Sequence, residues 1–492
     1  MRVHRGTAPD RGSELRYGGS PGNSLLEALG VIVFAGVKFL LGDVMSKLID
    51  AVRKSSFVCG LALAMIVPVA SARAAEFKVL HSFHGGSDGE YPEAGLATDG
   101  SGTLYGTTFG DLGQGGPGKV CSKTCGNVYS YVDGVGLNTE YFFQAGADGA
   151  FPAGELFVQS GIIYGTTEYG GATACGGPGC GTAFLLPTGG GTNNVLKLCA
   201  SKFPSCAKGA FPHAGAIVDS KGNAFGTTSL GGRGNGSLCG SNFSGCGVVY
   251  MLQPNLAEKV LYSFCSKPRC KDGGVPLGRL LMDSAGDLYG TTQFGGEYSQ
   301  GTVFELQLAN GSYSYKVLYS FCQNNVANCP DGAVPEAGLI ADASSNFYGT
   351  TTFGGGSDCY GNPGCGVIFK LTQSGGVWTE SVLHGFQGGA SDGMFPESPL
   401  VADGAGNLYG TTLKGGGGQY CIQVRSCGTV FRLASDGTVK VIYAFGSQVK
   451  GADGVQPEGA LLWQDPYLYG VTRVQGDPTC QCGTLYRINT QQ

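Results

Sequence analysis

Carboxylates recur at one position of this chain with a spacing that could build a ligand site. The motif Asp-Gly-x-x-Pro occurs six times, beginning at Asp88, Asp148, Asp272, Asp331, Asp392 and Asp453. Glutamate follows the proline in four copies, at Glu93, Glu336, Glu397 and Glu458. Ca²⁺ prefers clustered oxygen ligands, so these glutamates could hold Ca²⁺ or a cationic ligand. The alternative is that Asp-Gly forms a turn and the glutamates are solvated.

Three residues break this pattern with side chains suited to acid–base chemistry. Lys208 replaces the aspartate in one further copy, His213 follows the proline of that copy, and Arg279 lies in the next copy. Together they could supply an acid or base and an anion clamp, although drift among repeats explains the same residues. His81 and His384 occupy equivalent positions, which favours a structural role. We recognise no metal-binding histidine cluster, nucleophile elbow or phosphate loop. We predict no cofactor, and Ca²⁺ at the glutamates is the alternative.

Aromatic residues lie close to these polar positions. Tyr169, Phe294 and Phe353 stand five positions after a repeated tyrosine and precede a Gly-Gly pair. Exposed rings could stack on sugar rings, with neighbouring polar groups bonding the hydroxyls. The alternative is that the rings fill gaps between structural units.

The elements that carry these residues form seven repeats. The tetrad Tyr-Gly-Thr-Thr or a near variant begins at Tyr105, Tyr164, Phe225, Tyr289, Tyr348, Tyr409 and Tyr469. Each repeat holds four short runs rich in β-branched and aromatic residues, which predict strands. An Asp-x-x-Gly-Asn turn separates the second run from the third. Seven four-stranded antiparallel units predict an all-β, seven-bladed β-propeller.

The ends of the repeated region predict how the ring closes. We name the strands of a blade A to D from the centre outward, with the tetrad in strand B. The last blade lacks a D strand, whereas residues 77–83 provide a spare one at the start. We therefore expect the N-terminal strand to complete the last blade. An open stack would leave both edges unpaired.

The quoted residues resemble a known family. Asp-x-x-Gly-Asn-Leu-Tyr-Gly-Thr-Thr, followed by Gly-Gly and Gly-Thr-Val-Phe-x-Leu, resembles the GloVer tandem repeat of choice-of-anchor proteins. The hairpin of strands A and B also resembles NHL repeats, which form propellers. The resemblance implies an exported bacterial repeat protein and no established biochemical activity.

The start of the chain predicts export. Residues 45–74 contain basic residues, an apolar core and Ala72-Arg73-Ala74, the three parts of a signal peptide. We interpret residues 1–44 as a mispredicted extension; a genuine N-terminal membrane anchor is the alternative. Residues 75–492 would then be one propeller, secreted or periplasmic, without a membrane span.

Eighteen cysteines remain after the predicted signal peptide, and they form nine local pairs. Both members of a pair are present or absent together, which indicates disulfides rather than zinc sites. Six pairs lie in loops between strands B and C: Cys121 with Cys125, Cys175 with Cys180, Cys239 with Cys246, Cys359 with Cys365, Cys421 with Cys427, and Cys480 with Cys482. Three lie in loops between strand D and the next strand A: Cys199 with Cys206, Cys265 with Cys270, and Cys322 with Cys329. Both loop types should emerge on one face, which the disulfides would stiffen.

The charge of the chain after the predicted signal peptide limits which classes of partner it could bind. After residue 74 the chain carries 22 basic and 31 acidic residues and no basic run. Nucleic acid is therefore not an expected partner. We expect a monomer that binds a glycan or a surface protein through the disulfide face without catalysis. The alternatives are a polysaccharide lyase or hydrolase acting at the channel mouth, and a structural or adhesive module.

Overall fold

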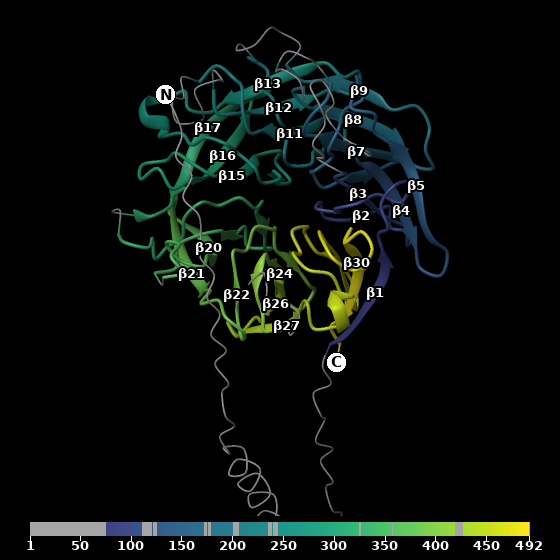
Figure 1. The fold of residues 1–492 in the computed structure, drawn as a ribbon. Helices are drawn as coiled ribbons and strands as arrows, with labels where there is room; N and C mark the ends of the chain where they lie inside the picture. Colours follow the sequence, from purple (N-terminus) through teal and green to yellow (C-terminus); the bar gives the residue numbers. More distant parts are fainter. Residues whose placement is uncertain are drawn as a thin grey trace, which may run out of the picture. The chain divides into compact units, whose positions relative to one another are not determined.

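The structure is a computed structural model, and it describes residues 75–491 except 111–120, 122–124, 172–174, 176–178, 200–205, 235–238, 240–244, 324–325, 357 and 419–426. Seven four-stranded antiparallel sheets form a ring, as Figure 1 shows. Cavities lined by residues at their innermost strands form a channel at its centre. This arrangement confirms the predicted seven-bladed propeller. The predicted signal peptide and the extension before it lie outside the described residues.

Three blades form the first part of the ring. Blade 1 contains β2 (Ala97–Thr98), β3 (Leu104–Thr108), β4 (Asn127–Val132) and β5 (Gly136–Phe142). Blade 2 contains β6 (Phe157–Gln159), β7 (Ile162–Thr167), β8 (Thr182–Pro187) and β9 (Asn194–Lys197). Blade 3 contains β10 (Ile217–Val218), β11 (Ala224–Thr228), β12 (Val248–Leu252) and β13 (Glu258–Ser263).

Three more blades follow in the same order. Blade 4 contains β14 (Leu281–Met282), β15 (Leu288–Thr292), β16 (Thr302–Ala309) and β17 (Ser312–Ser320). Blade 5 contains β18 (Ile340–Ala341), β19 (Phe347–Thr351), β20 (Val367–Ser374) and β21 (Val377–Gly385). Blade 6 contains β23 (Val401–Ala402), β24 (Leu408–Thr412), β26 (Thr429–Leu433) and β27 (Val439–Ala444).

Blade 7 closes the ring with strands from both ends of the chain. It contains β28 (Leu462–Gln464), β29 (Tyr467–Thr472), β30 (Thr484–Asn489) and β1 (Glu76–Ser82). β1 pairs antiparallel with β30 from Glu76↔Asn489 to Ser82↔Thr484. The predicted closure by the N-terminal strand is therefore confirmed.

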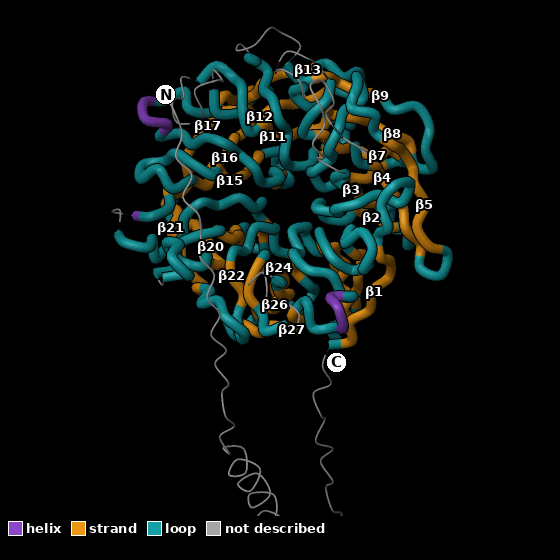
Figure 2. Tube along the Cα trace, in the orientation of Figure 1, coloured by secondary structure: helices purple, strands orange, loops and turns teal. Residues whose placement is uncertain are grey.

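Outside the blades, β22 (Gly393–Met394) pairs with β25 (Lys414–Gly415), and two 3₁₀ turns, η3 (Pro268–Cys270) and η5 (Val449–Gly451), lie in loops (Figure 2). Within the described ranges, no helix has the length and apolar composition needed to cross a membrane.

Aromatic pairs form the core between adjacent blades. A phenylalanine after strand D of one blade packs against the strand C aromatic ring of the next, with centroids 5.1–5.3 Å apart. The pairs are Phe83–Tyr129, Phe143–Phe184, Phe264–Phe304, Phe321–Phe369, Phe386–Phe431 and Phe445–Tyr486. Nearly all of these rings are fully buried. Tilted and edge-on aromatic pairs add to the gain from burial, so they stabilise six of the seven joints between blades. At the joint between blades 2 and 3, the buried Leu198 takes the place of the phenylalanine.

The repeated tetrad builds the joint between blades. Its glycine leaves room for the strand C aromatic ring, since a Cβ on Gly290 would lie 2.7 Å from Phe304 Cζ. The next threonine donates to a carbonyl of the following blade, as Thr291 does to Ala337 O at 2.7 Å. The last threonine bonds within its own blade, as Thr292 does to Phe294 O and the Thr302 hydroxyl. These contacts show that the tetrad has a structural role in joining adjacent blades.

The two faces of the ring are built differently. On one face, strands A and B are joined by short turns; Asp403, for example, accepts hydrogen bonds from the backbone N–H groups of Ala405 and Asn407. The opposite face carries the longer B–C and D–A loops. These loops meet at repeated bridges such as Ala150↔Tyr169, Gly274↔Phe294 and Ala333↔Phe353. We call the first the hairpin face and the second the loop face.

Candidate functional site

The channel mouth on the loop face is shaped by an unusual backbone conformation. In all seven D–A loops the residue before the proline has a positive φ of 57–59°. These residues are Tyr91, Phe151, Phe211, Val275, Val334, Phe395 and Gln456. For side chains other than glycine this region costs energy, so the surroundings must impose it. The sequence analysis did not predict it.

The B–C loops hold that conformation through backbone hydrogen bonds. The N–H of the left-handed residue donates to a carbonyl of the preceding B–C loop in every copy, as Val275 N–H does to Cys246 O at 2.7 Å. In six copies the acceptor is the second cysteine of the predicted pair. These six cysteines are Cys125, Cys180, Cys246, Cys365, Cys427 and Cys482. Blade 4 lacks cysteines in this loop, and Gln300 O accepts instead. The cysteine-containing loops therefore position the start of strand A in the next blade.

The described residues contain eight of the nine predicted disulfides, which are thereby confirmed. Five lie in B–C loops: Cys121 with Cys125, Cys175 with Cys180, Cys239 with Cys246, Cys359 with Cys365, and Cys480 with Cys482. Three lie in D–A loops: Cys199 with Cys206, Cys265 with Cys270, and Cys322 with Cys329.

The ninth predicted pair, Cys421 with Cys427, falls partly outside the described residues. Cys421 belongs to the segment 419–426, which the structure does not describe. Cys427 is described and is buried at the end of that loop. The pairing of Cys427 with Cys421 therefore stays a prediction, supported by the repeat position that Cys427 shares with the five confirmed B–C loop disulfides.

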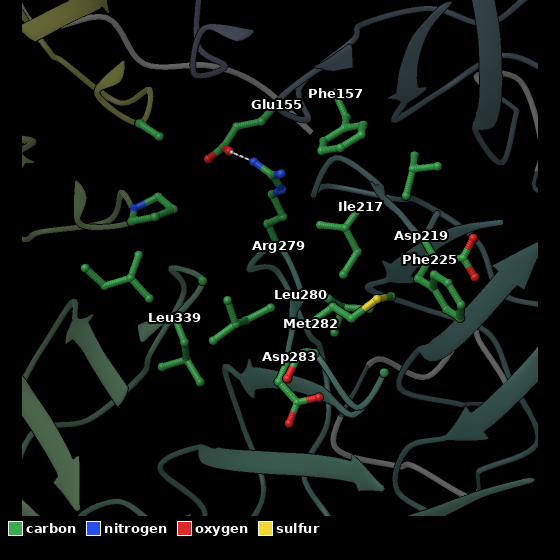
Figure 3. Close-up of a pocket in the computed structure, with 18 of the residues that line it drawn as sticks. Glu155, Phe157, Ile217, Asp219, Phe225, Arg279, Leu280, Met282, Asp283 and Leu339 are labelled. Carbon is green, nitrogen blue, oxygen red and sulfur yellow. Dashed lines mark hydrogen bonds and ion pairs between the residues drawn. The ribbon is translucent and has the colours of Figure 1, made fainter. Parts of the chain in front are cut away.

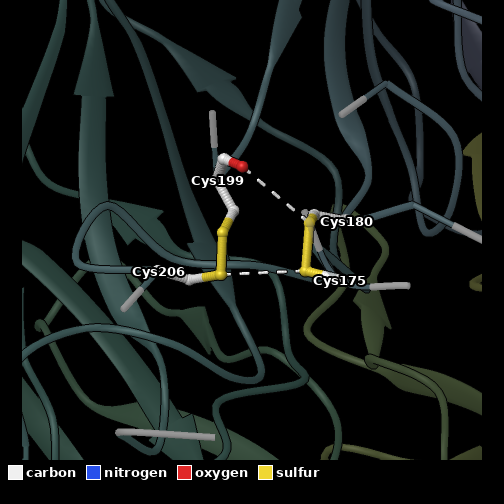
Figure 4. A group of neighbouring side chains, drawn as sticks. All are labelled: Cys175, Cys180, Cys199 and Cys206. Carbon is white, nitrogen blue, oxygen red and sulfur yellow. Dashed lines mark hydrogen bonds between the residues drawn. A yellow bond between two sulfur atoms is a disulfide. The ribbon is translucent and has the colours of Figure 1, made fainter. Parts of the chain in front are cut away.

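Two of the disulfides lie side by side. Figure 4 shows them, with 3.7 Å between Cys175 Sγ and Cys206 Sγ. One bridge belongs to a B–C loop and the other to a D–A loop, which confirms that the two loop types share a face. So many disulfides indicate an extracellular or periplasmic protein.

Residues of all seven blades enclose a cavity of about 290 Å³ at this mouth. Four predicted glutamates line it: Glu93, Glu336, Glu397 and Glu458. His213, Arg279 and Glu155 line it as well. We call this cavity the acidic mouth. The residues after each motif proline come together there because the prolines lead into the innermost strands.

Arg473 partly neutralises the acidic mouth. Its Nε lies 2.7 Å from Glu93 Oε1, and its Nη1 lies 3.3 Å from Glu458 Oε1. Desolvation raises the pKa of Glu93 to about 8, although Arg473 opposes the shift. Desolvation also raises the pKa of Glu458. Arg473 follows the tetrad of blade 7, a position whose nearness to the mouth the sequence analysis missed.

The other two glutamates differ in their partners. Glu336 accepts hydrogen bonds from Gln293 Nε2 and from the Thr352 hydroxyl, the latter at 2.9 Å. Glu397 has no hydrogen-bond or ion-pair partner among the described residues. Desolvation raises the pKa of Glu397 to about 8, and the charges of Glu336 and Glu458 add to the shift. Glu397 is thus the mouth carboxyl whose hydrogen-bonding capacity remains open.

The residues that break the repeat pattern do not form one group. His213 Nε2 lies 3.5 Å from Glu168 Oε1, and Arg279 Nη1 lies 3.0 Å from Glu155 Oε2. Desolvation lowers the pKa of His213, but the nearby carboxylates of Glu168, Glu93 and Glu336 outweigh this effect. The pKa of His213 is therefore raised. Lys208 does not line the mouth; its Nζ lies 3.5 Å from Glu258 Oε2. The expected His–Arg–Lys group is therefore wrong for Lys208, whose side chain pairs with strand D of blade 3.

The Arg279–Glu155 pair separates two parts of the channel. Both residues line the acidic mouth and also a larger cavity of about 810 Å³ toward the hairpin face. Figure 3 shows the Arg279 side chain reaching Glu155, with Ile217, Leu280 and Leu339 around the larger cavity. Most of the residues that line this cavity are apolar, and the acidic residues Asp219 and Asp283 line it as well.

The candidate aromatic residues differ in exposure. Phe294 is 40% exposed on the loop face. Tyr169 packs edge-on against Phe151 and Phe211, with centroids 5.8 and 5.6 Å away. Phe353 packs edge-on against Phe395 at 5.4 Å. Tyr169 and Phe353 therefore fill gaps between blades, and Phe294 presents an accessible ring.

The aspartates of the Asp-Gly motif stabilise their own D–A loops by accepting hydrogen bonds. Asp272 accepts from the Tyr262 hydroxyl of strand D at 2.7 Å and from the Ser266 N–H at 2.9 Å. The same tyrosine–aspartate bond occurs at Asp148, Asp331 and Asp453. His81 and His384 replace the tyrosine at Asp88 and Asp392. Their predicted structural role agrees with these contacts.

Residues 360–492 match the Gloeobacter/Verrucomicrobia repeat family, which confirms the predicted GloVer resemblance for that part of the chain. No curated protein matches the chain.

Solved structures with a similar arrangement include enzymes of low identity. The GH74 xyloglucanase from Xanthomonas campestris is 12% identical with a TM-score of 0.48, over 84% of this chain and 55% of that one. The GH74 enzyme from Niastella koreensis is 12% identical with a TM-score of 0.46, over 83% and 55%. Trypanosoma rangeli sialidase is 10% identical with a TM-score of 0.43, over 84% and 59%. At this similarity none of them bears on the chemistry of the mouth.

Proposed function

We propose that this protein is an exported binding protein that takes a glycan at the acidic mouth and does not transform it. The observation that carries the proposal is Glu397, a carboxyl without a polar partner among the described residues, beside Glu336 and His213 in one cavity. Desolvated polar groups gain most from a ligand that completes their hydrogen bonds. Sugar hydroxyls both donate and accept, so they suit carboxyls that titrate near neutral pH.

The charge of the mouth favours a hydroxyl-bearing ligand over Ca²⁺. Arg473 already pairs with Glu93 and Glu458, and its guanidinium would repel a cation. Glu336 is engaged by Gln293 and Thr352. Ca²⁺ needs six to eight oxygen ligands, which these four glutamates do not offer while they keep their present partners.

Rigidity supports a role in recognition. The left-handed residues that precede the motif prolines are held by hydrogen bonds that their N–H groups donate to carbonyls of the B–C loops, six of which contain cysteines. A site fixed before the ligand arrives loses less conformational entropy on binding. The exposed ring of Phe294 on the same face provides a stacking surface for a sugar at the rim.

The alternative is catalysis by His213 and Arg279, but both side chains already form ion pairs. Arg279 bonds Glu155 rather than pointing freely into the mouth, and His213 lies against Glu168. An anion clamp would first have to exchange one of these partners. A surface protein as ligand, or an adhesive role, would use the wider loop face rather than the cavity.

A glycan array probed with oxidised residues 75–492, with and without Ca²⁺, tests the proposal. We expect selective, Ca²⁺-independent binding that Glu397→Gln weakens at least tenfold. Glu297→Gln is the matched control, since Glu297 is exposed and its carboxylate pairs, among the described residues, with Lys271 alone. Binding that is unchanged in Glu397→Gln, or absent for every glycan, would overturn the proposal. Product release by the wild type that His213→Ala abolishes would favour the lyase or hydrolase.

Export itself requires a separate test. We propose that residues 45–74 are the signal peptide and that the exported chain begins at Ala75. N-terminal sequencing of the protein recovered outside the cytoplasm should give Ala75. A chain that retains residues 1–44 would favour the membrane anchor instead.

A further inference from the structure

Two histidines and an aspartate meet where the chain closes its own ring. His81 lies in β1, and His84 and Asp88 lie in the D–A loop that follows it. His81 Nε2 is 3.0 Å from Asp88 Oδ1, and His84 Nδ1 is 3.3 Å from Asp88 Oδ2. One donor atom from each of the three side chains lies within 4.8 Å of the others.

The other blades show which part of this cluster is structural. The aspartate pairs with a tyrosine or histidine of strand D in six repeats, so the His81–Asp88 contact belongs to the architecture. Blade 5 has the same histidine–aspartate pair, His384 and Asp392, but Gln387 occupies the position of His84. The remaining four repeats have glutamine or serine there, at Gln144, Ser266, Gln323 and Ser447. Among these six repeats, only His84 adds a second imidazole.

The spacing of the donor atoms suits a small divalent metal. In a tetrahedral site with metal–ligand bonds of about 2.0–2.1 Å, neighbouring ligand atoms lie roughly 3.3 Å apart. To one and the same oxygen, Asp88 Oδ2, the distances are 3.1 Å from His81 Nε2 and 3.3 Å from His84 Nδ1. Zn²⁺ and the neighbouring divalent metals of the first transition row bind imidazole nitrogens and carboxylates, so two histidines and one aspartate suit them. Ca²⁺ and Mg²⁺ prefer sites built from oxygen ligands.

A fourth residue supports His84 from the opposite side. Asp477, in the B–C loop of blade 7, places Oδ2 3.5 Å from His84 Nε2. Metal-bound histidines usually donate their other ring N–H to a carboxylate or carbonyl, which fixes the tautomer. Asp477 can play that part when His84 Nδ1 holds a metal. His84 is 60% exposed, so water can reach the remaining coordination position.

We infer that His81, His84 and Asp88 form a site for a divalent transition metal of the Zn²⁺ class. Asp477 is a positioning residue that orients His84. The metal would tie β1 to the loop that follows it, and through Asp477 to the B–C loop of blade 7. It would thus reinforce the one blade whose strands come from both chain ends. This inference is independent of the glycan proposal, because none of these residues lines the acidic mouth.

Isothermal titration of oxidised, untagged residues 75–492 with ZnCl₂ tests the inference. This segment contains the closed ring and four histidines, of which His213 and His384 lie elsewhere. We expect one equivalent of Zn²⁺ to bind and to raise Tm. His84→Gln, which copies the residue of blade 5, should weaken binding at least 100-fold. Asp477→Asn should weaken it about 10–100-fold.

His384→Gln is the matched control, because it removes a histidine from the equivalent site that lacks a second imidazole. It should leave the affinity for Zn²⁺ unchanged. Histidine NMR signals report the same site independently: Zn²⁺ should shift those of His81 and His84 and leave those of His213 and His384 in place. Absence of Zn²⁺ binding to the wild type would overturn the inference, as would unchanged binding in His84→Gln.

Discussion

The hairpin face and the loop face solve the same problem, joining strands, by different means. On the hairpin face each turn is satisfied locally, since an aspartate such as Asp342 caps the N–H groups of Ser344 and Asn346 within its own turn. On the loop face each D–A loop depends on the preceding B–C loop and adopts left-handed conformations at non-glycine residues. The eight described disulfides all lie on the loop face.

This difference indicates which face carries features that lower the stability of the fold and serve another role. The eight described disulfides, most of the left-handed non-glycine residues, and three buried carboxyls with raised pKa, Glu93, Glu397 and Glu458, lie toward the loop face. Such features persist only where the surroundings over-determine them, and they cluster at sites of recognition. The hairpin face carries none of the described disulfides, and its few left-handed non-glycine residues, such as Ser160 and Ser345, lie in tight turns between adjacent strands.

The largest expected effect comes from reducing the disulfides. Each closes a loop of only a few residues, worth roughly 2 kcal/mol on the entropic view, so losing several removes at least about 5 kcal/mol, comparable to the net stability of many proteins. The loss should begin on the loop face. Hydrogen exchange during reduction should show residues 265–275 losing protection before residues 403–409. Simultaneous loss on both faces would break the distinction between them.

A second effect concerns pH. The pKa of Glu397 is raised to about 8 in the folded state from about 4.5, so the folded protein binds an extra proton between these values. Its contribution to stability is therefore full below about pH 4.5 and is lost as the pH rises through 8. Glu397→Gln should be more stable than the wild type at pH 9, by on the order of 3 kcal/mol, and equal to it near pH 4.

Denaturant unfolding from pH 4 to 9 measures this difference. Glu297→Gln, on the same face but exposed, should follow the wild-type profile. Parallel profiles for the wild type and Glu397→Gln would mean that the carboxyl is not desolvated, and the mouth would then resemble the rest of the surface.

A third effect compares one aspartate from each face. Asp392 accepts the N–H groups of Gln387 and Gly393 and contacts His384 on the loop face. Asp403 caps a turn on the hairpin face. Because Asp392 is the more buried, Asp392→Ala should cost about 2–3 kcal/mol and Asp403→Ala about 1 kcal/mol. Equal costs, measured by urea unfolding, would contradict the idea that the loop face carries the greater constraint.

The smallest effect tests the left-handed backbone. Val275 is β-branched and has a φ of 57°, a conformation that asparagine tolerates better. Val275→Asn should therefore raise the free energy of unfolding by up to about 1 kcal/mol. Val441→Asn, at a regular position of β27, should lower it instead. Destabilisation of both variants to the same degree would remove the argument for strain.

The repeats explain how much could be predicted from the sequence. Tetrads, turn residues and paired cysteines recur about every sixty residues, and recurrence alone predicted the seven blades, the closing strand and the eight described disulfides. Features unique to one repeat were harder to predict. Arg473 follows a tetrad like six other residues, and only the closed ring brings it to Glu93 and Glu458.

Contacts across the closure were missed for the same reason. His81-x-x-His84 and Asp88 are close in sequence and could have indicated a metal site, but Asp477 lies nearly four hundred residues away. Lys208 was grouped with His213 and Arg279 because all three depart from the repeat pattern. The side chain of Lys208 instead reaches Glu258.

Hydrogen–deuterium exchange of oxidised residues 75–492, with and without the glycan selected on the array, tests the central claim most directly. The account predicts new protection on the loop face, at residues 89–96, 333–340 and 393–400, and unchanged exchange at the hairpin turns 219–223 and 403–407. Protection confined to the hairpin turns would contradict the assignment of binding to the acidic mouth.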